Sequence, residues 1–137
     1  MIQFFFENIA EIAIPPCTET WLQQLISNEG KKVGDINYIF CDDEHLLQVN
    51  RDFLQHDYYT DVITFDYVKG KTISADIFVS LHRISENAAL SENFDSELLR
   101  VLAHGILHLC GYKDKTPAEI SVMRQKENFY LSNFLGA

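Results

Sequence analysis

The sequence lacks the features of a membrane, secreted or disulfide-rich protein. None of its apolar runs approaches the roughly 18 residues that a membrane-spanning helix needs. Its first residues lack the basic region and the small-residue cleavage site of a signal peptide. The three cysteines, Cys17, Cys41 and Cys110, are scattered and odd in number, which argues against a disulfide framework. Together these absences predict a cytoplasmic protein that does not associate with a membrane.

Basic residues are scarce: 11 Lys and Arg stand against 20 Asp and Glu, and the formal net charge is −9. The deficit lies in residues 1–68, which hold 12 acidic and 3 basic residues, whereas residues 69–137 hold 8 of each. A net negative charge disfavours non-specific nucleic-acid binding, so composition argues against an RNA partner without excluding one, and we expect no DNA partner. The neutral second half still carries lysines and arginines that can form a local basic surface for RNA.

The length of 137 residues and the hydrophobic content of 47% suit one globular domain over 1–137. Runs rich in β-branched and aromatic residues predict four strands, at 2–6, 35–41, 62–65 and 73–79. Apolar residues at helical spacing, with N-caps such as Thr18, Asp42 and Thr116, predict five helices, at 18–29, 44–53, 81–90, 96–109 and 117–135. We expect loops at 54–61 and 91–95. This order favours an α+β or α/β fold in which helices pack on a mixed four-stranded sheet.

The stretch 98–116 holds the strongest chemical signal. His104 and His108 are four residues apart in an apolar run, so on a helix both imidazoles lie on one face. Gly111 can end that helix, and the turn after it can bring Asp114 back toward the histidines. Two imidazoles, a carboxylate and an open position are typical of a catalytic metal site. We therefore predict that His104, His108 and Asp114 bind one divalent ion; zinc is the first candidate, and iron, nickel and manganese also suit these donors.

Another interpretation of the same residues needs no metal. The two histidines can form a buried pair that hydrogen-bonds to backbone carbonyls, and Asp114 can cap the last helix in competition with Thr116. Gly105 restricts the chemistry of a metal site. Zinc peptidases with a His-Glu-x-x-His helix use the Glu after the first His as general base, and Gly105 occupies that position here without a side chain. Glycine within a helix costs about 1 kcal/mol relative to alanine, so close approach of a substrate or tight helix packing must explain it. A metal-bound water would need a base from elsewhere.

The other candidate ligands have simpler explanations. Cys110 is only two residues from His108, so we expect it on a different face of the helix as a small buried residue. The isolated His45, His56 and His82 are expected to be exposed or paired locally. The acidic run 42–44 is expected to cap a helix rather than to bind a metal.

Several segments, in the same order, resemble one bacterial family. Residues 104–112 (His-Gly-Ile-Leu-His-Leu-Cys-Gly-Tyr) resemble the His-Gly-x-Leu-His-Leu-x-Gly-Tyr-Asp-His signature of the YbeY proteins, which are rRNA maturation factors. Residues 60–65 (Thr-Asp-Val-Ile-Thr-Phe) resemble the family's Thr-Asp-Val-Leu-Ser-Phe segment, and residues 74–77 resemble its Gly-Asp-Ile strand. Met123 to Glu127 resemble the Met and Glu of its last helix. A match in several ordered segments is far more specific than one motif.

The resemblance implies a zincin-like α+β fold with a metal helix and a zinc site. It also implies a metal-dependent endoribonuclease that cuts single-stranded RNA, acts in 16S rRNA 3′-end maturation and ribosome quality control, and meets rRNA or the small ribosomal subunit in the cytoplasm. Three positions depart from the family pattern: Asp114 replaces a His as third ligand, Leu54 replaces an Arg, and Ala75 replaces a Gly. Leu54 removes an expected phosphate contact, which Arg51 or a lysine near the site would have to replace.

Two other functions use the same residues. A peptidase or other metallohydrolase would share the metal site but would lack the usual Glu base at Gly105. A non-catalytic ribosome-associated factor would hold the metal for structural reasons, and Leu54 and the net charge of −9 count in its favour, although the endoribonuclease remains the leading hypothesis. Cleavage of RNA or of peptides by the purified protein distinguishes these functions.

Overall fold

Four strands form one mixed sheet in the computed structural model, which describes residues 1–56, 61–91 and 93–135. The strands are β1 (Ile2–Phe6), β2 (Lys32–Cys41), β3 (Val62–Asp66) and β4 (Thr72–Ser80). They lie in the order β1-β2-β4-β3. The pairs β1–β2 and β2–β4 are parallel, whereas β3 runs antiparallel to β4. The sheet is therefore mixed, as the sequence predicted.

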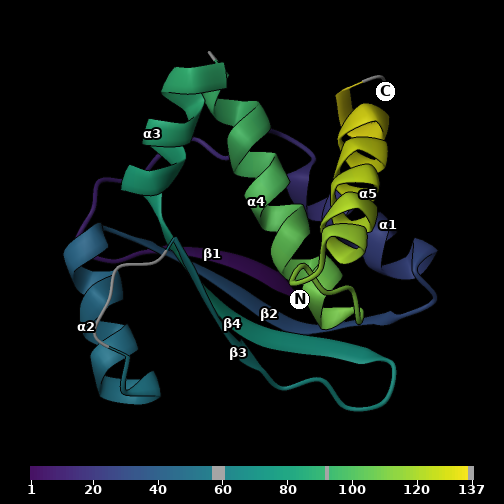
Figure 1. Cartoon of the computed structure of the whole chain (residues 1–137), viewed down its shortest axis with the longest axis horizontal. Helices are drawn as coiled ribbons and strands as arrows, with labels where there is room; N and C mark the ends of the chain where they lie inside the picture. The colour runs from purple at the N-terminus through teal and green to yellow at the C-terminus, as the bar shows by residue number, and fades with distance from the viewer. Residues whose placement is uncertain (57–60, 92, 136–137) are drawn as a thin grey trace.

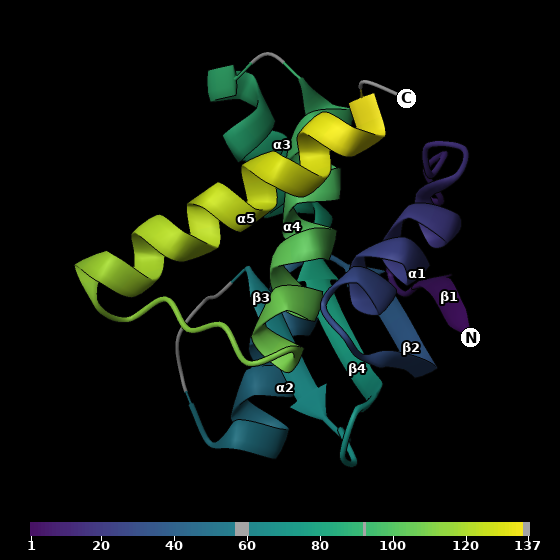
Figure 2. The same cartoon turned by 90° about the vertical axis from the view of Figure 1, so that its right-hand side faces the viewer.

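Five helices cover the two faces of this sheet (Figure 1). They are α1 (Thr18–Asn28), α2 (Asp43–Leu54), α3 (Leu81–Ser91), α4 (Phe94–Leu109) and α5 (Pro117–Leu135). α1 and α4 lie on one face, and α3 and α5 pack against α4. α2 lies on the opposite face beside β3 and β4, and Figure 2 shows α5 crossing α4. The helix that carries the two histidines is thus packed between the sheet and α5.

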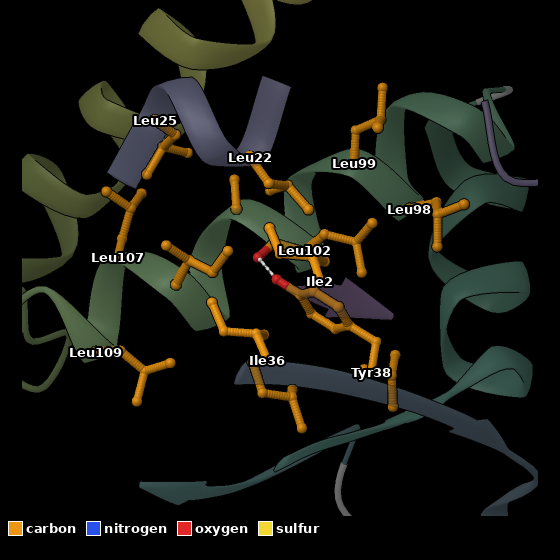
Figure 3. Packing of buried hydrophobic residues seen from close by; sticks show 14 of the residues in the cluster. Ile2, Leu22, Leu25, Ile36, Tyr38, Leu98, Leu99, Leu102, Leu107 and Leu109 are labelled. Atoms are coloured by element: carbon orange, nitrogen blue, oxygen red, sulfur yellow. Dashed lines mark hydrogen bonds between the residues drawn. The ribbon is translucent and has the colours of Figure 1, made fainter. Parts of the chain in front are cut away.

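The main core lies between the sheet and α4. Alternate residues of β4 are buried toward the helices, as the period of two along a strand requires. Tyr38 of β2 is completely buried in this cluster, and its hydroxyl donates a hydrogen bond of 2.7 Å to the backbone carbonyl of Leu102 in α4 (Figure 3). Burial raises the pKa of this hydroxyl well above its usual value, so it stays protonated as a donor. Apolar packing and this bond together fix α4 on the sheet.

Most helix boundaries agree with the sequence, and three differ. Thr18 is not an N-cap but the first helical residue: Cys17 occupies the cap position with φ 68°, and the Thr18 hydroxyl donates to the Pro15 carbonyl at 2.5 Å. α2 extends through Leu54, which we had expected in a loop. α4 begins at Phe94, because the Asn93 side chain accepts a hydrogen bond of 2.9 Å from the Ser96 N–H and so caps the helix earlier.

The predicted cap of the last helix is confirmed. The Thr116 hydroxyl accepts from the Glu119 N–H at 3.1 Å, and the Glu119 carboxylate accepts from the Thr116 N–H at 3.0 Å, a reciprocal capping box. Part of the predicted loop, residues 57–60, lies outside the described ranges, and so does Thr60 of the segment that resembles the family. Among the helices described, none is long and apolar enough to cross a membrane.

Candidate metal centre

The last turns of α4 bring the predicted ligands together. His104 and His108 lie one helical turn apart, and their Nε2 atoms approach to 2.9 Å. Gly111 follows the helix with φ +113°, a conformation that glycine adopts more readily than other residues, and the chain then turns back. The turn places Asp114 Oδ2 3.3 Å from His104 Nε2 and 3.3 Å from His108 Nε2. One donor atom from each of the three residues therefore converges on one point.

The other ring nitrogens fix the tautomers of both histidines. His108 Nδ1 lies 2.9 Å from the backbone carbonyl of Tyr112, which can only accept, so Nδ1 carries the proton. His104 Nδ1 lies 2.6 Å from Glu127 Oε2, and this carboxylate likewise accepts. When both imidazoles are neutral, each therefore presents an unprotonated Nε2; in the 2.9 Å hydrogen bond between the two Nε2 atoms, a proton on one of them takes the place of a metal ion. Two imidazole lone pairs and one carboxylate face each other, an arrangement that a cation stabilises.

The spacing of the donor atoms suits a transition-metal ion. Ligand atoms around a tetrahedral zinc lie about 3.3–3.4 Å apart when each bond is about 2.0–2.1 Å. The three separations here are 2.9, 3.3 and 3.3 Å, so small shifts would complete the geometry. Three protein ligands leave a fourth position for water or substrate. The residues present thus fit a catalytic metal, and the same donors suit iron, nickel and manganese.

Glu127 of α5 supports the site from behind. Its side chain is 6% exposed, and Oε1 accepts a hydrogen bond of 2.9 Å from the Arg100 guanidinium. Burial would raise the pKa of Glu127, but hydrogen bonds from His104 and Arg100 outweigh it and lower the pKa. Burial would likewise lower the pKa of His104, yet the hydrogen bond and charge of Glu127, with the charges of Asp114 and Asp61, raise it. The negative charge around His104 therefore attracts cations.

A cavity of about 580 Å³ opens beside the three candidate ligands. It is lined by the residue before β3 and by residues of β3, α3, α4, the following turn and α5. They are Asp61, Val62, Thr64, Asn87, Glu97, Arg100, Val101, His104, Gly105, His108, Asp114, Arg124 and Glu127. The cavity has room for several groups of a polar substrate next to the donor cluster.

Comparisons with known proteins agree with this fold and identify the family. The sequence profile described as Endoribonuclease YbeY matches residues 6–135. The chain belongs to the YbeY family. The Endoribonuclease YbeY of Flavobacterium johnsoniae is 48% identical over 135 residues, which cover 98% of this chain and 97% of the relative. That of Cytophaga hutchinsonii is 52% identical over 134 residues, covering 94% and 93%.

A solved structure supports the same fold. The solution structure of TM1509 from Thermotoga maritima has a TM-score of 0.71 at 28% identity, and the match covers 99% of this chain and 90% of that one. The resemblance to the YbeY family and the α+β fold, both predicted from the sequence, are confirmed.

The other candidate ligands of this YbeY-family chain have structural functions outside the three-residue cluster. Cys110 packs against the apolar core, and burial raises the pKa of its thiol to about 11. His82 pairs with Glu86 on the same helix, as expected for a locally paired histidine. His45 is also paired, but its partners Glu7 and Asn8 are distant in the sequence rather than local. Asp42 caps α2 by accepting from the His45 N–H at 2.7 Å.

The structure also favours the metal interpretation over the metal-free one. A hydrogen bond to a backbone carbonyl is present at His108, as the metal-free interpretation expects, but it leaves both Nε2 atoms facing each other. Thr116, not Asp114, caps the last helix. Asp114 therefore has no capping function to explain its position beside the histidines.

Sequence reasoning missed Glu127, Arg100 and Asp61 as parts of the site. Glu127 lies 23 residues from His104 and contacts it only through the packing of α5 on α4. Residue spacing does not reveal such a contact. The one signal for Glu127 was that residues 123–127 resemble part of the last helix of the YbeY proteins. This resemblance marked the segment but gave Glu127 no function.

Proposed function

We propose that this chain is a metal-dependent endoribonuclease that cleaves single-stranded RNA during rRNA maturation. Its membership of a family of endoribonucleases makes it a hydrolytic nuclease. The finer assignment is processing of the 16S rRNA 3′ end and ribosome quality control in the cytoplasm, with rRNA or the small ribosomal subunit as partner. Residues 1–137 form one hydrolase domain in this proposal, and one zinc ion is held by His104, His108 and Asp114.

One observation carries the proposal. Two imidazole Nε2 atoms and a carboxylate oxygen converge within 3.3 Å beside a cavity of about 580 Å³. Such a donor set suits a cation, and the cavity leaves room for a substrate next to it. A bound divalent ion would polarise a phosphoryl oxygen and lower the pKa of a water molecule toward neutrality.

The residues of this chain prepare the site for that chemistry. Glu127 and the Tyr112 carbonyl hold the protons on both Nδ1 atoms, so that both Nε2 atoms stay available as ligands. Arg100 orients Glu127 and offsets its charge. Gly105, in the position of the peptidase Glu, offers no general base, which argues against peptide hydrolysis.

The test is the cleavage of a single-stranded oligoribonucleotide by His108→Ala, with His82→Ala as control. His82 is exposed on α3 and, among the described residues, pairs with Glu86 one turn away. We expect loss of bound metal and of cleavage in His108→Ala, with circular dichroism showing a retained fold. His82→Ala should match the wild type in both measurements. Undiminished cleavage by a metal-depleted His108→Ala would overturn the metal mechanism.

A further inference from the structure

The two arginines that line the cavity have different surroundings. The Arg100 side chain is 22% exposed, and its guanidinium donates to Glu127 Oε1 at 2.9 Å and to Asn128 Oδ1 at 3.0 Å. These contacts commit Arg100 to holding α5 and Glu127 in place. It is therefore a positioning residue rather than a contact for substrate.

Arg124 is available to a ligand. It lies on α5 one turn before Glu127, and its side chain is 61% exposed. In the part of the chain that the structure describes, its guanidinium makes one ion pair, at 3.7 Å from Glu127 Oε1. A guanidinium carries five N–H donors, and a contact of that length uses none of them well.

Arg124 also occupies a position that a chain-like substrate would pass. A second cavity of about 280 Å³ lies beside the first and is lined by His104, Asp114, Ile120, Met123, Arg124 and Glu127. Arg124 lines both cavities, together with His104, Asp114 and Glu127. A strand that crosses the metal centre from one cavity to the other therefore passes this guanidinium.

We propose that Arg124 binds a phosphate of single-stranded RNA next to the cleaved phosphodiester. This inference rests on the proposed function and names a residue that recognises the substrate. A guanidinium binds a phosphate through two parallel charge-assisted hydrogen bonds, which a point charge cannot reproduce. Asp61, Glu97, Asp114 and Glu127 repel a phosphate, so an exposed cation in the same cavity is needed to hold one.

Arg124 can also supply the phosphate contact that the chain lacks because Leu54 replaces the family's Arg. Leu54 ends α2 and does not line the cavity, and neither does Arg51 on the same helix. The lysines that follow α4, Lys113 and Lys115, are likewise outside the described cavity lining. The phosphate contact therefore comes from α5 in this chain, not from the candidates that the sequence suggested.

The experiment compares Arg124→Gln, Arg124→Lys and Lys71→Gln with the wild type. Lys71 is exposed in the turn between β3 and β4, outside the cavity, and its substitution removes the same charge. Each zinc-loaded protein is titrated into a short fluorescein-labelled oligouridylate with 2′-O-methyl phosphorothioate linkages, which resist cleavage, at several salt concentrations. Anisotropy gives Kd. Metal content is measured on the same preparations, and cleavage is measured separately with unmodified oligouridylate.

Arg124→Gln should raise Kd about three- to tenfold near 0.15 M salt and reduce the slope of log Kd against log salt by about 0.7, the value for one phosphate of a single strand. Arg124→Lys should keep the slope but lose part of the affinity, and Lys71→Gln should match the wild type. Metal content should be equal in all four proteins. A wild-type Kd and slope in Arg124→Gln, an equal loss in Lys71→Gln, or no RNA binding by the wild type would overturn the inference.

Failure of the proposed function has a different signature. Arg124-dependent binding without any RNA cleavage by the wild type would overturn the nuclease assignment and leave the phosphate contact standing. Cleavage by the wild type with no effect of Arg124→Gln on Kd or on the salt slope would support the nuclease assignment and overturn the phosphate contact at Arg124.

Discussion

Glu127 Oε2 lies 2.6 Å from His104 Nδ1, so a carboxylate on α5 sets the tautomer of an imidazole on α4. The Glu127 side chain is almost fully buried, and the Arg100 guanidinium offsets its charge at 2.9 Å. A buried, ionised acceptor makes the imidazole a stronger donor toward a metal at its other nitrogen. Packing of α5 on α4 would therefore also strengthen the binding of a metal ion at His104.

Glu127→Gln should weaken metal binding by about 10- to 100-fold, because the neutral amide keeps the shape of the side chain but loses the charge that supports His104. Competition with a chromophoric chelator measures the change. Glu97→Gln is the matched control, since it removes a carboxylate from the same cavity without a hydrogen bond to His104. Equal metal affinity in Glu127→Gln and Glu97→Gln would show that Glu127 acts only through overall charge.

Asp114→Ala should lose most of its bound metal, because two imidazoles alone hold a divalent ion weakly. Elemental analysis after dialysis against a chelator gives the ion content per chain. Asp114→His is the informative companion, as it restores a third nitrogen donor in the place where the YbeY signature has one. Unchanged metal content in Asp114→Ala would remove this residue from the ligand set.

Glu29, at the end of α1, links a distant helix to the metal centre. Its Oε1 accepts a hydrogen bond of 2.7 Å from the Tyr112 hydroxyl, and Tyr130 and Lys126 bind its other oxygen. Burial would raise the pKa of Glu29, but hydrogen bonds from Tyr130, Tyr112 and Lys126 lower it. The carbonyl of the same Tyr112 accepts from His108 Nδ1, so this cluster anchors the turn after α4.

Glu29→Gln should therefore destabilise the fold by about 1.5 kcal/mol at neutral pH, the low end of the usual range for hydrogen bonds to a charged group. Because the folded-state pKa is lowered, the stabilisation is present above the unfolded value of about 4.3 and is lost as the pH falls through the folded value. Urea unfolding between pH 7 and pH 3 should show the wild-type advantage shrinking in acid. An advantage that stays constant over this range would exclude ionised Glu29 as its source.

Local patterns predicted much of this molecule, and long-range contacts explain what they missed. His104 and His108 were predictable because a helix brings residues four apart onto one face, and Asp114 because Gly111 turns the chain within a few residues. Glu29 is 83 residues from Tyr112, and their contact depends on how α1 packs beside α4. The prediction that Thr18 caps α1 was wrong for a local reason, because its hydroxyl donates a hydrogen bond to the Pro15 carbonyl instead of accepting one from the helix.

Two explanations were given for the glycine at position 105, tight helix packing and close approach of a substrate. The structure favours the second. A Cβ at this position would lie 3.4 Å from Ile77 Cδ1 and 3.7 Å from Ile77 Cγ2, which is ordinary contact, so packing does not demand glycine. Gly105 also lines the cavity beside His104. Gly105→Ala should leave stability unchanged or raise it by up to about 1 kcal/mol through helix propensity.

The same substitution should slow RNA cleavage while leaving the metal content intact, because the added methyl narrows the floor of the cavity where a substrate approaches α4. Thermal unfolding, elemental analysis and cleavage kinetics on one preparation separate the two explanations. Ser85→Gly, at an exposed position of α3, is a control for helix propensity and should lower stability without a metal effect. A destabilised Gly105→Ala with normal cleavage would mean that the glycine serves the packing of α4 on β4, not the substrate.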